Sequence, residues 1–136
     1  MRVTRRGALA EIVQAAYPWP LWREFQGFTL RPQLASAETV LEVVWEQWPG
    51  IVSLTLHVPT SVDLAALAGT LVEVNSELSE GAFERRVSQG GREGLVYLTH
   101  AFLDHEQSID DAVILRSIDQ CIQSGEMFLT RFQRAP

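Results

Sequence analysis

The stretch that most constrains the fold runs from Pro59 to Leu103, because its apolar pattern changes there from the period of a helix to that of strands. Thr60 followed by Asp63 is a capping pattern for a helix N-terminus. Gly81 suits the residue that ends a helix, and Gly90-Gly91 suits the turn of a hairpin. The stretch therefore predicts a hairpin that follows one amphipathic helix, whose apolar side carries Leu64, Leu67, Ala68, Leu71 and Leu78.

Three strands are predicted before this helix, at residues 22–31, 39–47 and 51–58. Pro49-Gly50 has the composition of a turn between the second and the third. The third strand shows strict alternation, which is typical of a sheet covered on one face, with apolar residues at Val52, Leu54, Leu56 and Val58.

A further helix is predicted near each end of the chain. The first ends before Pro18, so residues 1–19 form an N-terminal helix and a proline-rich connector. Ser108 and Asp111 form a capping box for the last helix. The order α-βββ-α-ββ-α predicts a single α+β domain, residues 1–136, in which helices pack on one mostly antiparallel sheet as a two-layer sandwich.

Composition narrows the class of function. The chain has 136 residues and a net charge of −6, which argues against direct nucleic-acid binding, since that requires a basic surface. It contains no apolar run near the ~20 residues of a membrane helix, so we expect a soluble protein with no membrane partner. A single cysteine, Cys121, on an apolar helix stripe indicates a buried thiol in a reducing cytoplasm, with a reactive thiol as the alternative.

Catalytic motifs are missing from the sequence. It has no G-x-S-x-G elbow, and the cysteine lies on a core stripe, so we expect neither an enzyme nor a cofactor. His100, Asp104 and His105, with Glu106 beside them, are the one metal-like cluster. They suggest the competing hypothesis of a small-ligand or metal-binding sensor or enzyme. Their position at a strand end favours an ordinary polar loop.

Asn75 falls on the apolar side of the predicted central helix. An unpaired amide there would cost about 1–3 kcal/mol. We therefore expect Asn75 to be structural, with its amide bonded to backbone groups of a nearby strand or loop; a ligand contact is the alternative.

The second strand and the turn after it carry the candidate partner-binding residues. Trp48, beside the turn proline, is expected to be partly exposed, and Trp45 lies three residues before it. Tryptophan is enriched at interface hot spots. Glu42 and Glu46, on the opposite face of the same strand, would favour a basic partner, although a solvated sheet face with ordinary surface charges is the favoured explanation.

Two observations predict a homodimer. Ile109 and Val113 lie off the core stripe of the last helix, so they either pack against a loop or face a second chain. At least one edge of the sheet lacks the prolines or lysines that prevent pairing with another chain.

The central stretch also resembles a known family. A leucine-rich helix with the sequence LVEVNSEL at Leu71–Leu78, a G-x-F strand at Gly81–Phe83 and the strand GLVYL at Gly94–Leu98 are similar to the bacterial YbjN family. That family's members are described as regulators of sensory transduction, and their domain is similar to the type III secretion chaperones. The resemblance covers about residues 20–132. It implies a homodimer that holds an extended segment of a protein partner.

Together these observations predict a non-catalytic protein-binding module, a chaperone-like or adaptor-like regulator in the cytoplasm. The partner segment would bind by main-chain pairing or in a groove beside the Trp45–Trp48 hairpin.

Overall fold

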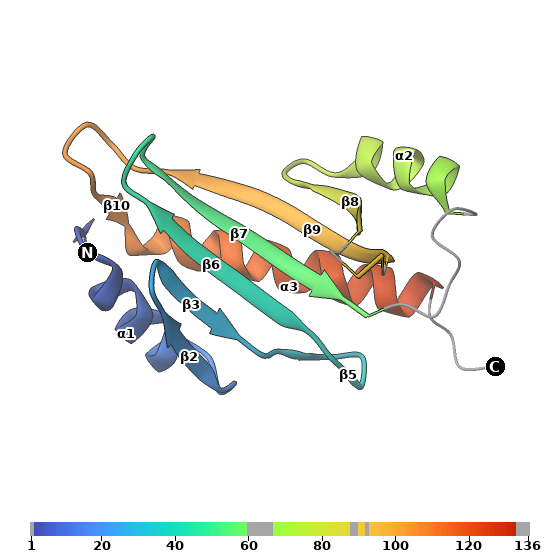
Figure 1. Cartoon of the computed structure of the whole chain (residues 1–136), viewed down its shortest axis with the longest axis horizontal. Coiled ribbons are helices and arrows are strands. Elements are labelled where there is room, and N and C mark those ends of the chain that lie inside the picture. Colours follow the sequence, from blue (N-terminus) through green and yellow to red (C-terminus); the bar gives the residue numbers. More distant parts are fainter. Residues whose placement is uncertain (1, 60–66, 88–89, 92, 133–136) are drawn as a thin grey trace.

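The computed structural model describes residues 2–59, 67–87, 90–91 and 93–132. Within them the chain forms three helices, one six-stranded sheet and two short strand pairs (Figure 1). The elements in chain order are β1 (Arg2–Val3), α1 (Arg6–Ala16), β2 (Leu21–Glu24), β3 (Gly27–Leu30), β4 (Gln33–Leu34), β5 (Ala37–Glu38), β6 (Val40–Glu46), β7 (Ile51–Val58), α2 (Ala68–Glu77), β8 (Ala82–Val87), β9 (Glu93–Phe102), β10 (Ile109–Asp110) and α3 (Asp111–Phe132).

The large sheet has the order β2-β3-β6-β7-β9-β8, and each neighbouring pair is antiparallel. All three helices contact strands of this sheet, so the predicted α+β class is confirmed. The strands predicted at 39–47 and 51–58 are β6 and β7, and the hairpin predicted across Gly90-Gly91 joins β8 to β9.

The strand predicted at residues 22–31 is wrong, because this segment is a hairpin of β2 and β3. Leu21 pairs with Leu30, and the chain reverses at Phe25 and Gln26. Gly27 permits a close approach to β6, since a Cβ atom at this position would lie 1.8 Å from the carbonyl oxygen of Val43. The alternating pattern continues through the turn, which is why the pattern alone suggested a single strand.

The core lies between α3 and one face of the sheet. Along β7 the even-numbered residues, such as Leu54 and Leu56, are buried, and the odd-numbered residues are partly exposed. The long helix α3 crosses behind the sheet (Figure 1), where the ring of Phe128 lies 5.2 Å from that of Phe83. Phe83 in turn lies 5.2 Å from Tyr97. The opposite sheet face, which we call the open face, stays accessible to solvent.

The helices agree with the prediction in part. Helix α1 ends at Ala16 as expected. The capping pair Thr60 and Asp63 lies outside the described residues, and α2 is described from Ala68. No helix in the described part of the chain is both long and apolar enough to cross a bilayer.

Asn75 has the structural position that its sequence context predicts. Its side-chain NH₂ donates to the carbonyl of Phe83 at 2.9 Å, and its Oδ1 accepts the N–H of Phe83 at 2.7 Å. These backbone groups lie on the outer edge of β8, so Asn75 pairs with them as a neighbouring strand would. The amide thus joins α2 to the sheet and covers part of an edge that we had expected to be open.

The start of α3 corrects two expectations. Ser108 does not cap the helix; the N–H of Ala112 donates to Oδ1 of Asp110 at 3.0 Å, so Asp110 is the cap. Ile109 is only 3% exposed and pairs with Val3 in the β1–β10 ribbon, which no sequence pattern had indicated. Ile109 therefore packs within its own chain and offers no surface to a second one. Val113 is half-buried against the core.

Candidate functional site

A cleft forms where several connections meet at one end of the sheet. The β2–β3 turn contributes Phe25 and Gln26, and the β6–β7 turn contributes Gln47 and Trp48. The start of α1 and the β9–β10 loop complete the walls. The N–H of Trp45 donates to the carbonyl of Gln26 at 2.8 Å, which fixes the β2–β3 turn against β6.

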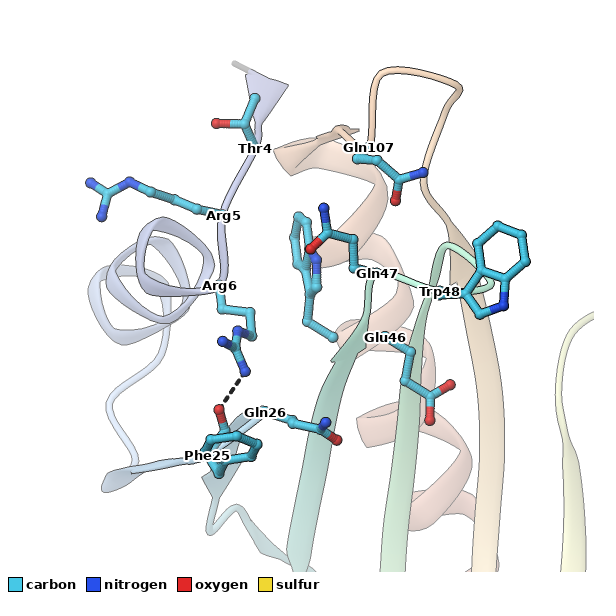
Figure 2. Close-up of a pocket in the computed structure, with 10 residues that line it drawn as sticks. Thr4, Arg5, Arg6, Phe25, Gln26, Glu46, Gln47, Trp48 and Gln107 are labelled. Carbon is cyan, nitrogen blue, oxygen red and sulfur yellow. Dashed lines mark hydrogen bonds between the residues drawn. The ribbon is translucent and has the colours of Figure 1, made fainter.

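The cleft has a volume of about 600 Å³ and an aromatic rim. Trp48 is 90% exposed and Phe25 is 89% exposed, although both are large apolar side chains. Trp45 lines the same cleft but is 6% exposed, so it forms part of the floor. Figure 2 shows Trp48 projecting outward on the side opposite Arg5 and Arg6.

One wall of the cleft is basic. Arg6 donates a hydrogen bond from its guanidinium group to the carbonyl of Phe25, and its Cζ lies 5.9 Å from the centre of the Phe25 ring. These contacts hold the Phe25 ring at the rim. Arg5, at the N-terminus of α1, points away from the cleft in Figure 2. Glu46 lies on the opposite wall and is partly exposed.

Amide groups supply the remaining polar surface. Gln26, Gln47 and Gln107 surround the opening (Figure 2), and each side chain carries both a donor and an acceptor. Oε1 of Gln107 is buried without a hydrogen-bond partner among the described residues. A peptide main chain presents alternating N–H and C=O groups, which amide side chains can match. Aromatic faces beside amides are well suited to binding a peptide segment.

Only some of the predicted partner-binding residues lie at the surface of the cleft. The expected exposure of Trp48 is confirmed, and Glu46 lines the cleft. Trp45 was expected at the contact surface, but it is buried beneath the cleft because its strand position faces the core. Glu42 lies outside the cleft on the open face, where its carboxylate is 2.6 Å from Nε2 of His57.

Phe25, Arg6 and Gln107 were not identified from the sequence. Phe25 was assigned to the middle of a strand. Had the turn before Gly27 been recognised, Phe25 would have been placed at the tip of a hairpin. Gln107 has a positive φ of 60°, within a loop whose approach to β6–β7 no local pattern indicates. Phe102, 74% exposed beside Ile51 on the open face, was missed as well.

The metal-like cluster is a structured loop. Oδ1 of Asp104 accepts hydrogen bonds from the N–H groups of Glu106 at 2.9 Å and Ser108 at 3.1 Å. The Ser108 N–H is the main cause that lowers the pKa of Asp104, and Arg2 pairs with the same carboxylate. His105 is exposed beside Glu106.

His100, Asp104 and His105 are not grouped as metal ligands in the described part of the chain. Among the residues that the structure describes, no group of three or more His, Cys, Asp or Glu side chains is arranged to hold a metal ion. The carboxylate of Asp104 bonds backbone groups of its own loop and the guanidinium group of Arg2.

Cys121 lies on the buried face of α3 and is 0% exposed. Burial raises the pKa of its thiol to about 12. A thiol that stays protonated at neutral pH is a poor nucleophile. The expected buried position is confirmed.

No known family, curated protein or solved structure matches the chain at a significant level. The fold and the cleft thus define an α+β domain with an aromatic, amide-lined cleft.

Proposed function

We propose that the chain is a non-catalytic protein-binding module, an adaptor-like or chaperone-like regulator that acts as a homodimer in the cytoplasm. Its partner contributes an extended segment that binds in the cleft between the β2–β3 and β6–β7 turns. The observation that carries the proposal is the exposure of Trp48 and Phe25, 90% and 89%, on the rim of one cleft.

Such exposure favours a binding surface over a solvated loop. Burying an aromatic side chain removes a large apolar area from water, at about 25 cal/mol per Å². Trp48 and Phe25 stand on two different hairpins, so a segment lying between them would contact both. Tryptophan in this position is typical of an interface hot spot.

The polar groups of the cleft indicate the chemistry of the segment. The three glutamine amides can bond its main chain whatever its sequence. Glu46 and the net charge of −6 favour a basic side chain near the β6 wall. Arg6 keeps its positive charge while it bonds the carbonyl of Phe25, so a basic side chain is expected beside Glu46 and away from the α1 wall.

The regulatory and dimeric parts of the proposal rest on other grounds. The resemblance to the YbjN family, at Leu71–Leu78, Gly81–Phe83 and Gly94–Leu98, supports a regulator and a dimer. In the structure Leu71 and Phe83 belong to the core, so these positions concern the fold and do not identify the partner. The open face, with Trp22 59% exposed, supports a second chain.

Affinity capture from an extract of the source organism tests the proposal. The wild-type chain should retain a protein that Trp48→Ala loses. Val72→Ala is the control, because it removes another exposed apolar side chain, on α2, away from the cleft. Equal capture by Trp48→Ala and wild type, with both folded, would rule out the cleft as the partner site.

A further inference from the structure

The two last strands of the sheet differ in length, and this leaves part of one edge uncovered. β9 has ten residues and β8 has six, and β8 pairs with β9 only as far as Leu98. Beyond that point, Thr99–Phe102 still pair with β7 on their other side. Among the described residues no strand pairs with the outer side of Thr99–Phe102, which we call the free edge.

Gly81 is the reason that β8 stops there. Its φ of 72° turns the chain away from β9, and a Cβ atom would lie 2.4 Å from the hydroxyl oxygen of Tyr97. That hydroxyl donates to the carbonyl of Glu80 at 2.7 Å, which holds the turn in place. The free edge is therefore kept open by a defined, hydrogen-bonded turn.

The backbone groups on the free edge can be assigned from the ladder. The N–H of Leu103 donates to Gly50 at 2.9 Å, so Leu103 and the odd-numbered residues of β9 point toward β7. His100 and Phe102 consequently direct their N–H and C=O groups outward. The β8–β9 ladder gives the same assignment. The N–H and C=O of Phe83 point away from β9 and bond Asn75, so its partner Tyr97 points its own groups toward β7, as the other odd-numbered residues of β9 do.

A groove of about 660 Å³ runs beside the free edge. Its other wall is the first part of α3, with Val113, Arg116 and Ser117. Arg116 is exposed and makes no hydrogen bond or ion pair within the described part of the chain. None of the residues that line this groove lines the Trp48 cleft.

We propose that the free edge and this groove bind a short extended segment of another protein, which adds as a strand in line with β8. Residues of the segment opposite His100 and Phe102 would form the hydrogen-bonded pairs and lie on the open face. The alternate residues would face α3, where an aliphatic side chain meets Val113 and a carboxylate meets Arg116. This is strand addition at an exposed edge.

The length of the edge argues against a second copy of this chain as the occupant. Two outward-facing residues can supply only a short ladder. A stable dimer buries about 1,600 Å² in total, much more than a strand contact of four residues provides. A single short segment matches both the edge and the groove.

Amide hydrogen exchange followed by NMR tests the edge in the protein alone. The N–H groups of His100 and Phe102 should exchange with solvent at least about tenfold faster than those of Thr99 and Ala101, which bond within the sheet. Equal protection of all four would show that the edge is covered, and would overturn the proposal. Protection of His100 and Phe102 that increases with protein concentration would assign the edge to a second copy and overturn it too.

Binding is tested with the peptide acetyl-Val-Thr-Val-Thr-Glu-Thr-amide at millimolar concentration. The largest NMR shift changes should fall on the amides of His100 and Phe102. Methylating the peptide's threonine nitrogens, which face β9 in this register, should weaken binding at least about tenfold. Methylating its valine and glutamate nitrogens, which face away, should leave binding intact. No binding, or equal binding by both methylated peptides, would overturn the proposal.

Variants of the protein provide the matching controls. His100→Pro removes an outward N–H without removing a bond to β7, and should abolish peptide binding, whereas His100→Ala keeps the N–H and should bind normally. Arg116→Gln should weaken binding of the glutamate-containing peptide and leave unchanged the binding of the same peptide with glutamine in place of glutamate. Because the methylated peptides use the wild-type chain, the test stands even if His100→Pro does not fold. The Trp48→Ala variant should bind the peptide normally, which separates this site from the proposed cleft.

Discussion

Asn75 shows how one side chain can complete a sheet edge. Asn75→Leu removes both hydrogen bonds to Phe83 and leaves a backbone N–H and C=O without partners. We expect the free energy of unfolding to fall by about 1–3 kcal/mol, measured by urea denaturation. Asn75→Asp keeps the acceptor for the Phe83 N–H but sets a carboxylate oxygen against the Phe83 carbonyl, so it should lose stability as well. Partner binding should survive in both variants; if binding vanished at unchanged stability, Asn75 would be a contact residue.

Cys121 should make stability depend on alkaline pH. The unfolded thiol ionises near pH 9 and the folded thiol near 12, so the folded state holds its proton more tightly. The contribution of this buried thiol to the free energy of unfolding is complete below pH 9 and is lost as the pH rises toward 12. Urea denaturation at pH 8 and pH 10.5 should show wild type losing more stability than Cys121→Ala between the two values. An equal loss in both would contradict the buried, protonated thiol.

Native Cys121 should also resist alkylation. Iodoacetamide at pH 8 should label the unfolded chain and leave the folded chain unmodified over the same time, as mass spectrometry would show. Rapid labelling of the folded chain would indicate a reactive thiol and revive the enzyme hypothesis.

At the scale of elements, Gly27 tests the contact between the β2–β3 hairpin and β6. Gly27→Ala places a Cβ atom 1.8 Å from a backbone oxygen of Val43, so the strands must separate. We expect a loss of about 1–3 kcal/mol or more in the free energy of unfolding. Gly69→Ala is the matched control in α2: its Cβ would meet nothing within 4 Å, and it should gain up to about 1 kcal/mol. Equal stability of the two variants would contradict the close approach of Gly27 to the backbone of β6.

Elements with regular patterns were predictable, whereas the β2–β3 turn and the cap of α3 were not. The alternation in residues 51–58 gave β7 correctly, because one face of that strand is buried and the other is open. The same rule failed at Phe25, where the alternation continued through a turn. The capping residue of α3 was misplaced by two positions, from Asp110 to Ser108, because both residues have suitable side chains.

The candidate site was predictable only at Trp48, where the local sequence indicates an exposed side chain. Trp48 stands beside a turn proline, so its exposure followed from its local sequence. The cleft around it joins Thr4, Phe25 and Gln107, which are far apart in the chain. Only the tertiary fold brings these segments together, and no local pattern encodes their distance.

For the whole molecule, we expect a homodimer whose contact includes the open face of the sheet. Light scattering should give twice the 15.3 kDa of one chain. Trp22→Asp should return the mass to that of a single chain, because it places a charge on a face that a second chain would bury. A wild-type mass of 15.3 kDa at micromolar concentration would exclude the dimer.

The central claim is that the cleft beside Trp48 binds a protein partner. Calorimetric titration of the captured partner into the purified chain measures this most directly. Trp48→Ala should raise the Kd about thirtyfold, the equivalent of about 2 kcal/mol for a hot-spot tryptophan, while Val72→Ala leaves it unchanged. An unchanged Kd for a folded Trp48→Ala variant would contradict the account.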